Sequence, residues 1–450
     1  MKSLVTDTRP FGTASRAGRR KLLRGLLLAA GLVVGLCLLG SLALTTWKAS
    51  VDRRLDASWR RSLGGASFLE RYPTTRSNAT VRDLESLSAA IGIEMAVVLT
   101  PRSILPAPEA ARRFEAVRAP LSAVYSAGRT ATEASLAPLP PELAAFLDSA
   151  RPGFDAIRKR LAQGPPPVWA RNLEAGFEAR IPNYLGLLTF QKVLLLEARE
   201  QLRAGREAQA AEVLETSWQL NEAMADNNPS LITQLIAQAV IRLQQPVLRS
   251  FSKAPAGWSE RLLHLDRRSR TLRALQCENF SAYLTSTFDR PIRDAMWGRR
   301  PQTLLRWMLW DYARRFSGMV ETLPQRDVRT FDPDAFEREQ RSTIPRWQII
   351  ARILLPNFGE FWPRSARIEL EAELTALVLE ERERLAASGP PRPTNRRPSR
   401  VQGLSWIYED LPDGTTLHLD GDLKYQETKP VPLRFTVRRS DRAREAGNAL

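Results

Sequence analysis

The segment "NNPSLITQLIAQAVIRLQQPVLRSF", residues 227–251, decides the fold, because it is apolar enough to suggest a membrane helix and yet carries a regular polar stripe. The stripe residues are spaced four, four and three apart and so share one side of a helix. They are Gln234, Gln238, Arg242 and Gln245. A membrane crossing would bring a charge and three amides into lipid, which is costly. The segment therefore predicts an amphipathic helix that starts at Asn228-Pro229-Ser230 and lies mostly buried in a helical bundle.

The preceding segment, residues 183–229, predicts two helices joined at Gly205-Arg206. Small side chains would let the two helices approach closely, while leucines fill the seam. The residues expected at this contact are Ala208, Ala211, Leu196 and Leu214. The sequence "RAGREAQAAEVL", residues 203–214, is similar to the turn of a tetratricopeptide-type hairpin. Because the resemblance covers only about a tenth of the chain and no copy follows at a fixed period, it implies one αα-hairpin in an irregular bundle.

The stretch "GLLLAAGLVVGLCLLGSLALTTW", Gly25–Trp47, is the only long uncharged run. It can cross a hydrocarbon core of about 30 Å as a helix, so it predicts a single membrane-spanning helix in contact with lipid. Arg24 and Trp47 are then expected at the two membrane interfaces. The alternative is a cleaved signal peptide, because Ser41 and Ala43 form a small-x-small pair. The run is longer than the usual ~7–15 apolar residues of such a peptide.

Positive charge gathers before this run. Seven basic residues and one acidic residue precede Gly25, which favours a cytoplasmic N-terminus and an extracytoplasmic bulk, anchored in the inner membrane of a bacterium. Five basic residues also follow the run before residue 62, so the asymmetry is incomplete. The net charge of +17 fits either solvated helix faces or a basic surface that meets anionic lipid or acidic polymer. We expect no nucleic-acid partner.

Composition and periodicity divide the chain into seven segments. They are a basic cytoplasmic segment (1–24), the membrane helix (25–47), a juxtamembrane helical region (48–167), a helical bundle with the αα-hairpin (168–389), a linker (390–400), a small β-sheet (401–440) and a tail (441–450). Further helices are expected at 109–126, 141–163, 259–284, 302–319 and 365–387. The expected fold class is therefore mainly α, with an N-terminal transmembrane helix, an irregular helical bundle and a small C-terminal antiparallel sheet.

The sheet is predicted from a change of period. The segments "LSWIYEDLPDGTTLHLDGDLKYQ", residues 404–426, and "PLRFTVRR", residues 432–439, alternate apolar and polar residues, which is typical of strands. Asp413-Gly414 is expected to form the turn between two of them. The apolar residues expected on common faces are Trp406, Tyr408, Leu417, Leu419, Leu433, Phe435 and Val437.

Aromatic and basic residues mix in "LLRWMLWDYARRF", residues 304–316. Trp307 and Trp310 are candidates for a second membrane-interface site, because indole rings favour the headgroup region and guanidinium groups bind phosphates. The alternative is aromatic core packing with an arginine edge in water.

The sequence offers little for catalysis. Histidine occurs only at 264 and 418 and cysteine only at 37 and 277, so we predict no catalytic triad, no metal site and no cofactor. No Gly-rich phosphate-binding motif is present. The densest acidic cluster is "FDPDAFERE", with Asp332, Asp334, Glu337 and Glu339. Because Asp334 precedes Ala335 and acids favour helix N-termini, we interpret the cluster as a helix cap.

These features predict a membrane-anchored, extracytoplasmic scaffold or adaptor protein of the bacterial cell envelope, with a protein partner and without enzymatic activity. The alternative is an envelope glycan hydrolase that uses a pair of carboxylates, for which the cluster at 332–339 is the candidate site.

Overall fold

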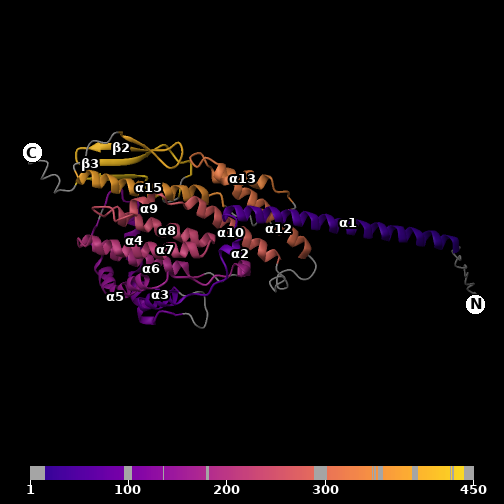
Figure 1. The fold of residues 1–450 in the computed structure, drawn as a ribbon, viewed down its shortest axis with the longest axis horizontal. Coiled ribbons are helices and arrows are strands. Elements are labelled where there is room, and N and C mark those ends of the chain that lie inside the picture. The colour runs from indigo at the N-terminus through magenta and orange to yellow at the C-terminus, as the bar shows by residue number, and fades with distance from the viewer. Residues whose placement is uncertain are drawn as a thin grey trace, which may run out of the picture. The chain divides into compact units, whose positions relative to one another are not determined.

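The computed structural model of the chain describes residues 16–95, 104–134, 136–178, 182–287, 302–346, 348, 351–352, 358–387, 394–425, 427 and 430–439. The fold is mainly helical with a small antiparallel sheet near the C-terminus (Figure 1), which confirms the expected fold class. Contacts group the chain into two units, Met1–Asp56 and Ala57–Leu450. The first fifteen residues, the tail 441–450 and positions 390–393 of the expected linker lie outside the described residues.

The helices are α1 (Arg16–Ser62), α2 (Phe68–Arg71), α3 (Ala79–Ala90), α4 (Pro108–Thr130), α5 (Pro141–Gln163), α6 (Tyr184–Arg203), α7 (Glu207–Asn227), α8 (Leu231–Leu248), α9 (Trp258–Leu263), α10 (Arg267–Thr287), α12 (Gln302–Thr322), α13 (Pro333–Ser342) and α15 (Phe361–Ala386). Short 3₁₀ turns cover Leu173–Glu178 and Leu323–Gln325. The strands are β1 (Arg396–Pro398), β2 (Ser405–Leu411), β3 (Gly414–Asp420) and β4 (Arg434–Arg438).

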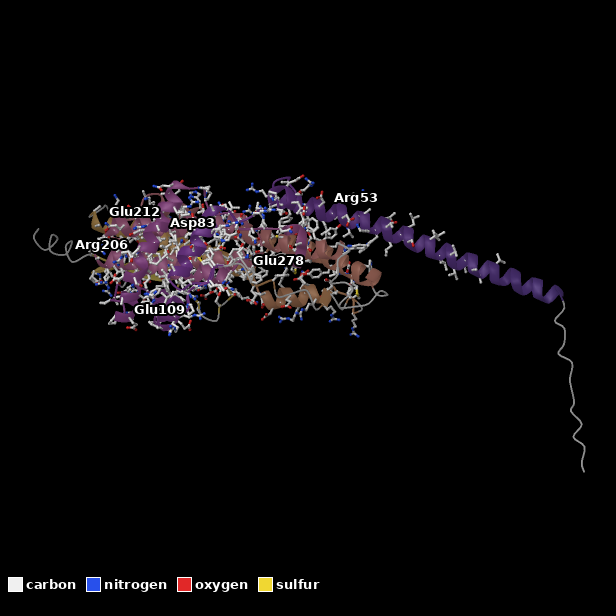
Figure 2. All side chains as sticks on the ribbon, turned by 90° about the horizontal axis from the view of Figure 1, so that it is seen from below. Arg53, Asp83, Glu109, Arg206, Glu212 and Glu278 are labelled. Atoms are coloured by element: carbon white, nitrogen blue, oxygen red, sulfur yellow. The ribbon has the colours of Figure 1, made fainter. Side chains whose placement is uncertain are left out.

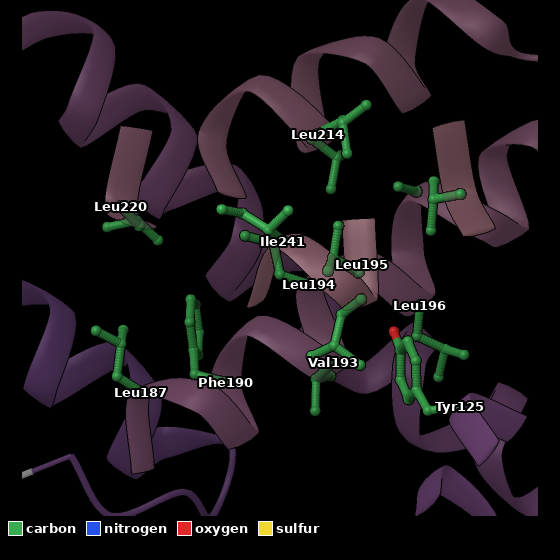
Figure 3. Packing of buried hydrophobic residues seen from close by; sticks show 14 of the residues in the cluster. Tyr125, Leu187, Phe190, Val193, Leu194, Leu195, Leu196, Leu214, Leu220 and Ile241 are labelled. Carbon is green, nitrogen blue, oxygen red and sulfur yellow. The ribbon is translucent and has the colours of Figure 1, made fainter. Parts of the chain in front are cut away.

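A hydrophobic cluster joins α3 to α9 and includes one side of α15. Its centre is the leucine-rich helix α6, where Leu194 and Leu195 are fully buried and face Leu214 of α7 and Ile241 of α8 (Figure 3). A second cluster joins α10, α12, α13 and the sheet to the opposite side of α15. Helix α15 therefore packs into both clusters.

Helices α6 and α7 form the expected αα-hairpin around Gly205, whose φ of 72° is a left-handed conformation that favours glycine. Leu196 and Leu214 are fully buried in the seam, as expected. The expected alanine contact is wrong in its register, because Ala208 is exposed and Ala211 is only partly buried, while Ala210 is fully buried. Helix α7 begins at Glu207, and this start sets which side of its first turn faces the core.

Helix α8 lies in the bundle, as its sequence predicts, and its polar stripe is buried as well. The amide N–H groups of Gln234 and Gln238 donate to other parts of the bundle, whereas their Oε1 atoms accept no hydrogen bond within the described residues. The Gln234 amide donates to the carbonyl of Ala225 at 2.9 Å, and the Gln238 amide donates to the hydroxyl of Thr271 at 3.0 Å. Burial of such groups is tolerated when each finds a hydrogen-bond partner.

The strongest of these contacts joins α8 to α15. Nε and Nη2 of Arg242 donate to the two oxygens of Glu371 at 2.7 and 2.8 Å, and Nη2 also donates to Glu427 at 2.9 Å. The Glu371 side chain is fully buried, and Arg242 is 7% exposed. This two-point geometry is the strong form of an arginine–carboxylate contact.

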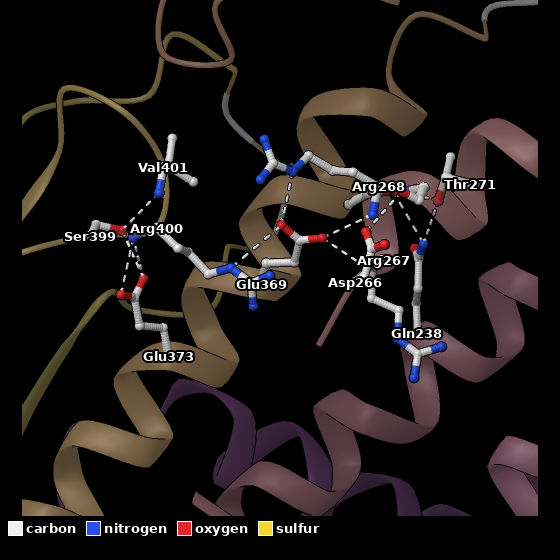
Figure 4. Close-up of polar contacts among 12 residues, drawn as sticks. Gln238, Asp266, Arg267, Arg268, Thr271, Glu369, Glu373, Ser399, Arg400 and Val401 are labelled. Carbon is white, nitrogen blue, oxygen red and sulfur yellow. Dashed lines mark hydrogen bonds and ion pairs between the residues drawn. The ribbon is translucent and has the colours of Figure 1, made fainter. Parts of the chain in front are cut away.

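Two residues earlier on α15, Glu369 is also fully buried. Its polar contacts are drawn in Figure 4. It accepts hydrogen bonds from the backbone N–H groups of Arg267 and Arg268 at 2.7 and 2.9 Å, and from Nε of Arg268 at 2.8 Å. Glu373 accepts from the Ser399 hydroxyl at 2.7 Å and from the Arg400 N–H at 3.2 Å. The buried carboxylates therefore tie α15 to the start of α10 and to the segment that follows β1.

The sheet is a meander in the order β1-β2-β3-β4, and β3 and β4 pack on α15 (Figure 1). Its expected apolar face is buried at Trp406, Tyr408, Leu417, Phe435 and Val437, while Leu419 and Leu433 are partly buried. The turn between β2 and β3 is Pro412-Asp413, one residue earlier than expected, because Gly414 already pairs with Leu411 and Arg438.

Two other expectations need correction. The single helix expected at 259–284 is two helices, because Asp266 caps α10 by accepting a hydrogen bond from the N–H of Ser269 at 3.1 Å. Part of the expected linker is strand β1, since Arg396–Pro398 pairs with β2.

We predict that Ala210→Trp destabilises the protein by at least about 1–3 kcal/mol, because the larger ring has no space between α6 and α7. The matched control is Ala208→Trp on the exposed side of the same turn, which should change the thermal midpoint little. Circular dichroism of the detergent-solubilised full chain measures both. Equal shifts in the two variants would mean that the hairpin is packed differently.

We also predict that Arg242→Met lowers stability by about 3–5 kcal/mol, because it leaves two carboxylates without their shared cation. Arg61→Met removes an exposed ion pair with Glu321 and should cost about 0–1 kcal/mol. Denaturant titrations of both variants provide the comparison.

The Arg242→Met defect should shrink as pH falls. Burial raises the pKa of Glu371, so this carboxyl takes up a proton above the pH at which it would do so in the unfolded chain. A protonated Glu371 needs no counter-charge, so acid favours the folded variant until the unfolded chain is protonated too. A defect that grows between pH 8 and 5 would contradict this explanation.

Candidate functional site

The apolar part of α1 is an uncovered hydrophobic surface. Leu28–Ser62 contains a window with a mean hydropathy of 2.2, none of which is buried, and it is long and apolar enough to cross a membrane by length and composition. Leu28, Leu32 and Leu38 are 76, 67 and 66% exposed. Such a surface is unfavourable in water.

The first pair of expected interface residues lies on this helix. Arg24 and Trp47 are both in α1 and lie 23 positions apart, as expected for the two ends of a span. Trp47 is partly buried, and Lys48 beside it forms an ion pair with Asp52 at 2.5 Å. Their role at the membrane stays a prediction.

The second pair, Trp307 and Trp310, lies on the first turns of α12. Trp310 is 9% exposed and Trp307 is partly exposed. The arginine edge of this helix is held by an acid, because Arg314 and Arg315 both bind Asp311, at 2.7 and 2.6 Å. The burial of Trp310 favours the alternative of core packing, and the interfacial role of both tryptophans stays a prediction.

The two histidines lie on different elements and have different neighbours. Nδ1 of His264 contacts the carbonyl of Glu260 at 2.9 Å at the end of α9, and His418 lies on β3 with Glu409 at 3.7 Å. Cys277 is buried, and burial raises the pKa of its thiol. Within the described ranges, no three His, Cys, Asp or Glu side chains are grouped to hold a metal ion.

The acidic residues at 332–339 do not act as one group in the folded chain. Asp332, not Asp334, caps α13, because the helix begins at Pro333 and the N–H of Ala335 donates to Asp332 at 2.9 Å. This bond lowers the pKa of Asp332, with help from Lys424 at 3.1 Å. Glu337 pairs with Arg341 and Glu339 pairs with Arg326. Asp332, Glu337 and Glu339 thus each bind a different cation and not one another.

Much of the surface charge is locally neutralised. Figure 2 shows Asp83, Glu109, Arg206 and Glu212 at the outside of the helical body. Arg160 binds Asp83 at 2.7 Å, and Glu212 lies 3.5 Å from Arg158. Exposed pairs of this kind add little stability, but they reduce the basic character of these faces.

The largest cavity among those characterised within the described residues is an open groove of about 750 Å³ beside α7. We call it the Trp218 groove. Its walls come from the end of α2, the Gly164–Val168 loop, α7 and α9. The proline break Gly164-Pro165-Pro166-Pro167, which follows α5, thus forms one wall, with Pro166 and Pro167 in the lining.

Aromatic rings and arginines organise the Trp218 groove. Trp218 packs edge-on against Trp258 at 5.3 Å, and the Arg261 guanidinium lies 5.8 Å and 5.4 Å from these two rings. Glu215 binds Arg261 and fixes it in this position. Across the groove, Arg171 lies 5.3 Å from the Tyr72 ring. Tryptophan, tyrosine and arginine are the residues that dominate the energetics of protein–protein contacts.

The carboxylates of the groove are paired. Glu222 binds Arg267 at 2.7 Å and Arg270 at 2.6 Å. Burial raises the pKa of Glu222, but these two arginines outweigh it and hold the pKa below its usual value. A general acid for glycoside cleavage needs a raised pKa, so Glu222 is unsuited to that role. The side chains of the groove are therefore suited to binding a partner and not to glycoside cleavage.

The sequence prediction named none of the groove's aromatic or basic residues. Trp218 and Arg261 are 43 positions apart in the sequence and meet only when α9 packs beside α7. The only sequence signal is the proline break that forms the wall.

No protein-family model matches the chain, and neither a curated protein nor a solved structure matches it.

Proposed function

We propose that this protein is a membrane-anchored adaptor of the bacterial cell envelope, which holds a protein partner in the Trp218 groove. The observation that carries the proposal is the combination, in one chain, of an uncovered apolar helix and an open groove built from tryptophan, tyrosine and arginine. The first supplies attachment to lipid, and the second supplies the anchors of a protein contact.

The proposed location is the inner membrane, with α1 as a single span, the N-terminus in the cytoplasm and the body outside it. Its support is the excess of basic residues before Gly25, since basic residues remain on the cytoplasmic side. Membrane lipid is then a partner through residues 25–47.

We predict that the full chain stays in the membrane pellet after an alkaline carbonate wash. A phosphatase that is active only after export should be active when it is fused after Leu450. The variant Leu36→Arg/Leu39→Arg should be released or degraded, because each central arginine costs about 2.5–3.5 kcal/mol of insertion. A shortened soluble product of the unaltered chain would instead show signal-peptide cleavage.

The groove is tested by photo-crosslinking in native membranes. A photoreactive residue at Gln219, in the groove lining, should yield a discrete protein adduct, while one at the exposed Glu212 on the same helix should not. Trp218→Ala should reduce the adduct by at least about tenfold, because truncating a tryptophan anchor typically costs 2 kcal/mol or more. Adducts of equal yield from both positions, or an adduct indifferent to Trp218→Ala, would refute the adaptor role of the groove.

The hydrolase alternative makes a different prediction in the same membranes. It requires release of soluble glycan fragments and loss of that release in Glu222→Gln or in the variants at Asp332 and Glu337. The paired state of these carboxylates supports the adaptor instead.

A further inference from the structure

A second cavity, of about 190 Å³, lies where α4, α6, α8 and α15 meet. We call it the cationic pocket. Its lining contains four cations, Arg129, Lys192, Arg242 and Arg364, together with Gln238 and otherwise aliphatic side chains. No carboxylate is among the residues that line it. The volume is below the ~300–1,000 Å³ of typical ligand pockets, so the cavity admits a small group or one end of a larger molecule.

The charges of the pocket are only partly compensated. Arg242 is bound by Glu371 and Glu427, and Glu427 also lies 3.9 Å from Arg364. Lys192 is partly buried, and no carboxylate in the described part of the chain lies within 4.0 Å of its ammonium group. Burial lowers the pKa of Lys192, and repulsion from Arg118 and Arg129 lowers it further. An anion in the pocket would relieve this repulsion.

Gln238 adds a second and independent feature. Its side chain is 3% exposed, and its amide N–H groups donate to Thr271 and Ser365, at 3.0 and 3.3 Å. Its carbonyl Oε1 is buried and accepts no hydrogen bond within the described residues. A buried acceptor without a donor costs free energy, so the matching ligand carries a hydroxyl as well as negative charge.

We propose that the cationic pocket binds a phosphate group without a second ester bond, either inorganic phosphate or the terminal phosphomonoester of a lipid. A hydrogen-phosphate group offers anionic oxygens to Lys192 and Arg364 and a P–OH donor to Oε1 of Gln238. A carboxylate or a sulfate lacks that donor at neutral pH. The proposal does not depend on the adaptor role, because the pocket and the Trp218 groove share no lining residue.

A separate apolar cavity near the cationic pocket is the candidate place for an alkyl chain of a lipid ligand. A mainly apolar cavity of about 240 Å³ is lined by Leu195 and Pro246, each three residues beyond a residue of the cationic pocket on α6 and α8. Three residues of helix correspond to about 4.5 Å along its axis. Small residues such as Gly128 form the wall on α4.

Calorimetric titration of the full chain in uncharged detergent tests the proposal, with inorganic phosphate, sulfate, dihexanoyl phosphatidic acid and dihexanoyl phosphatidylcholine as probes. Inorganic phosphate or phosphatidic acid should bind, and sulfate and phosphatidylcholine should bind at least about tenfold more weakly. Phosphatidic acid that binds tenfold better than phosphate identifies a lipid ligand, whereas equal affinities identify free phosphate. Absence of binding by both at about 10 mM would overturn the proposal.

Lys192→Met should weaken binding of the phosphate probe by about tenfold or more, since it removes the uncompensated cation. Lys159→Met on the exposed face of α5 is the matched control and should leave affinity unchanged. Lys192→Arg changes the side chain but keeps its charge, so it should retain binding. It thereby separates loss of charge from a folding defect. Equal affinities of Lys192→Met and Lys159→Met, or sulfate bound as tightly as phosphate, would show that the pocket is not the proposed phosphate site.

Discussion

The fold depends on the burial of carboxylates along α15. Glu369 and Glu371 have no exposed surface, and taking such ions out of water costs several kcal/mol each unless donors surround them. Arg242 of α8 and the Arg267-Arg268 pair at the start of α10 supply those donors. A rotation of α15 by one residue would separate the carboxylates from all of them. The ion pairs therefore fix the register between helices that leucine packing alone would leave adjustable.

The same helix explains where prediction from the sequence succeeds and fails. Its apolar residues lie on two opposite sides, with Ile368 and Ala372 in one cluster and Leu370 and Leu374 in the other. A periodicity argument looks for one apolar side and therefore predicts a surface helix. Segments with one apolar side, such as α5 at Pro141–Gln163, were predicted to the residue. Strand β1, which forms by pairing with β2, and the helix start capped by Asp266 were not.

Candidate sites follow the same division. The apolar helix is predictable because membrane crossing depends on length and composition, which one segment contains by itself. The Trp218 groove and the cationic pocket each combine residues from at least three helices, so no local pattern announces them. The polar stripe of α8 is the sequence feature that came closest to predicting one of these sites. Its Gln238 and Arg242 line the cationic pocket, but the sequence could not show which helices would face them.

The place of α15 in the chain has a consequence for biosynthesis. The cluster built by α3 to α9 is completed by Ile368, Ala372, Ala376 and Leu379, more than one hundred residues after α9 ends. A ribosome makes the chain from the N-terminus, so the apolar seam and the cation of Arg242 emerge well before the helix that covers them. The nascent bundle therefore passes through a stage at which its apolar surface is exposed and Arg242 lacks its carboxylate partner. Chaperone binding during this interval would favour correct assembly.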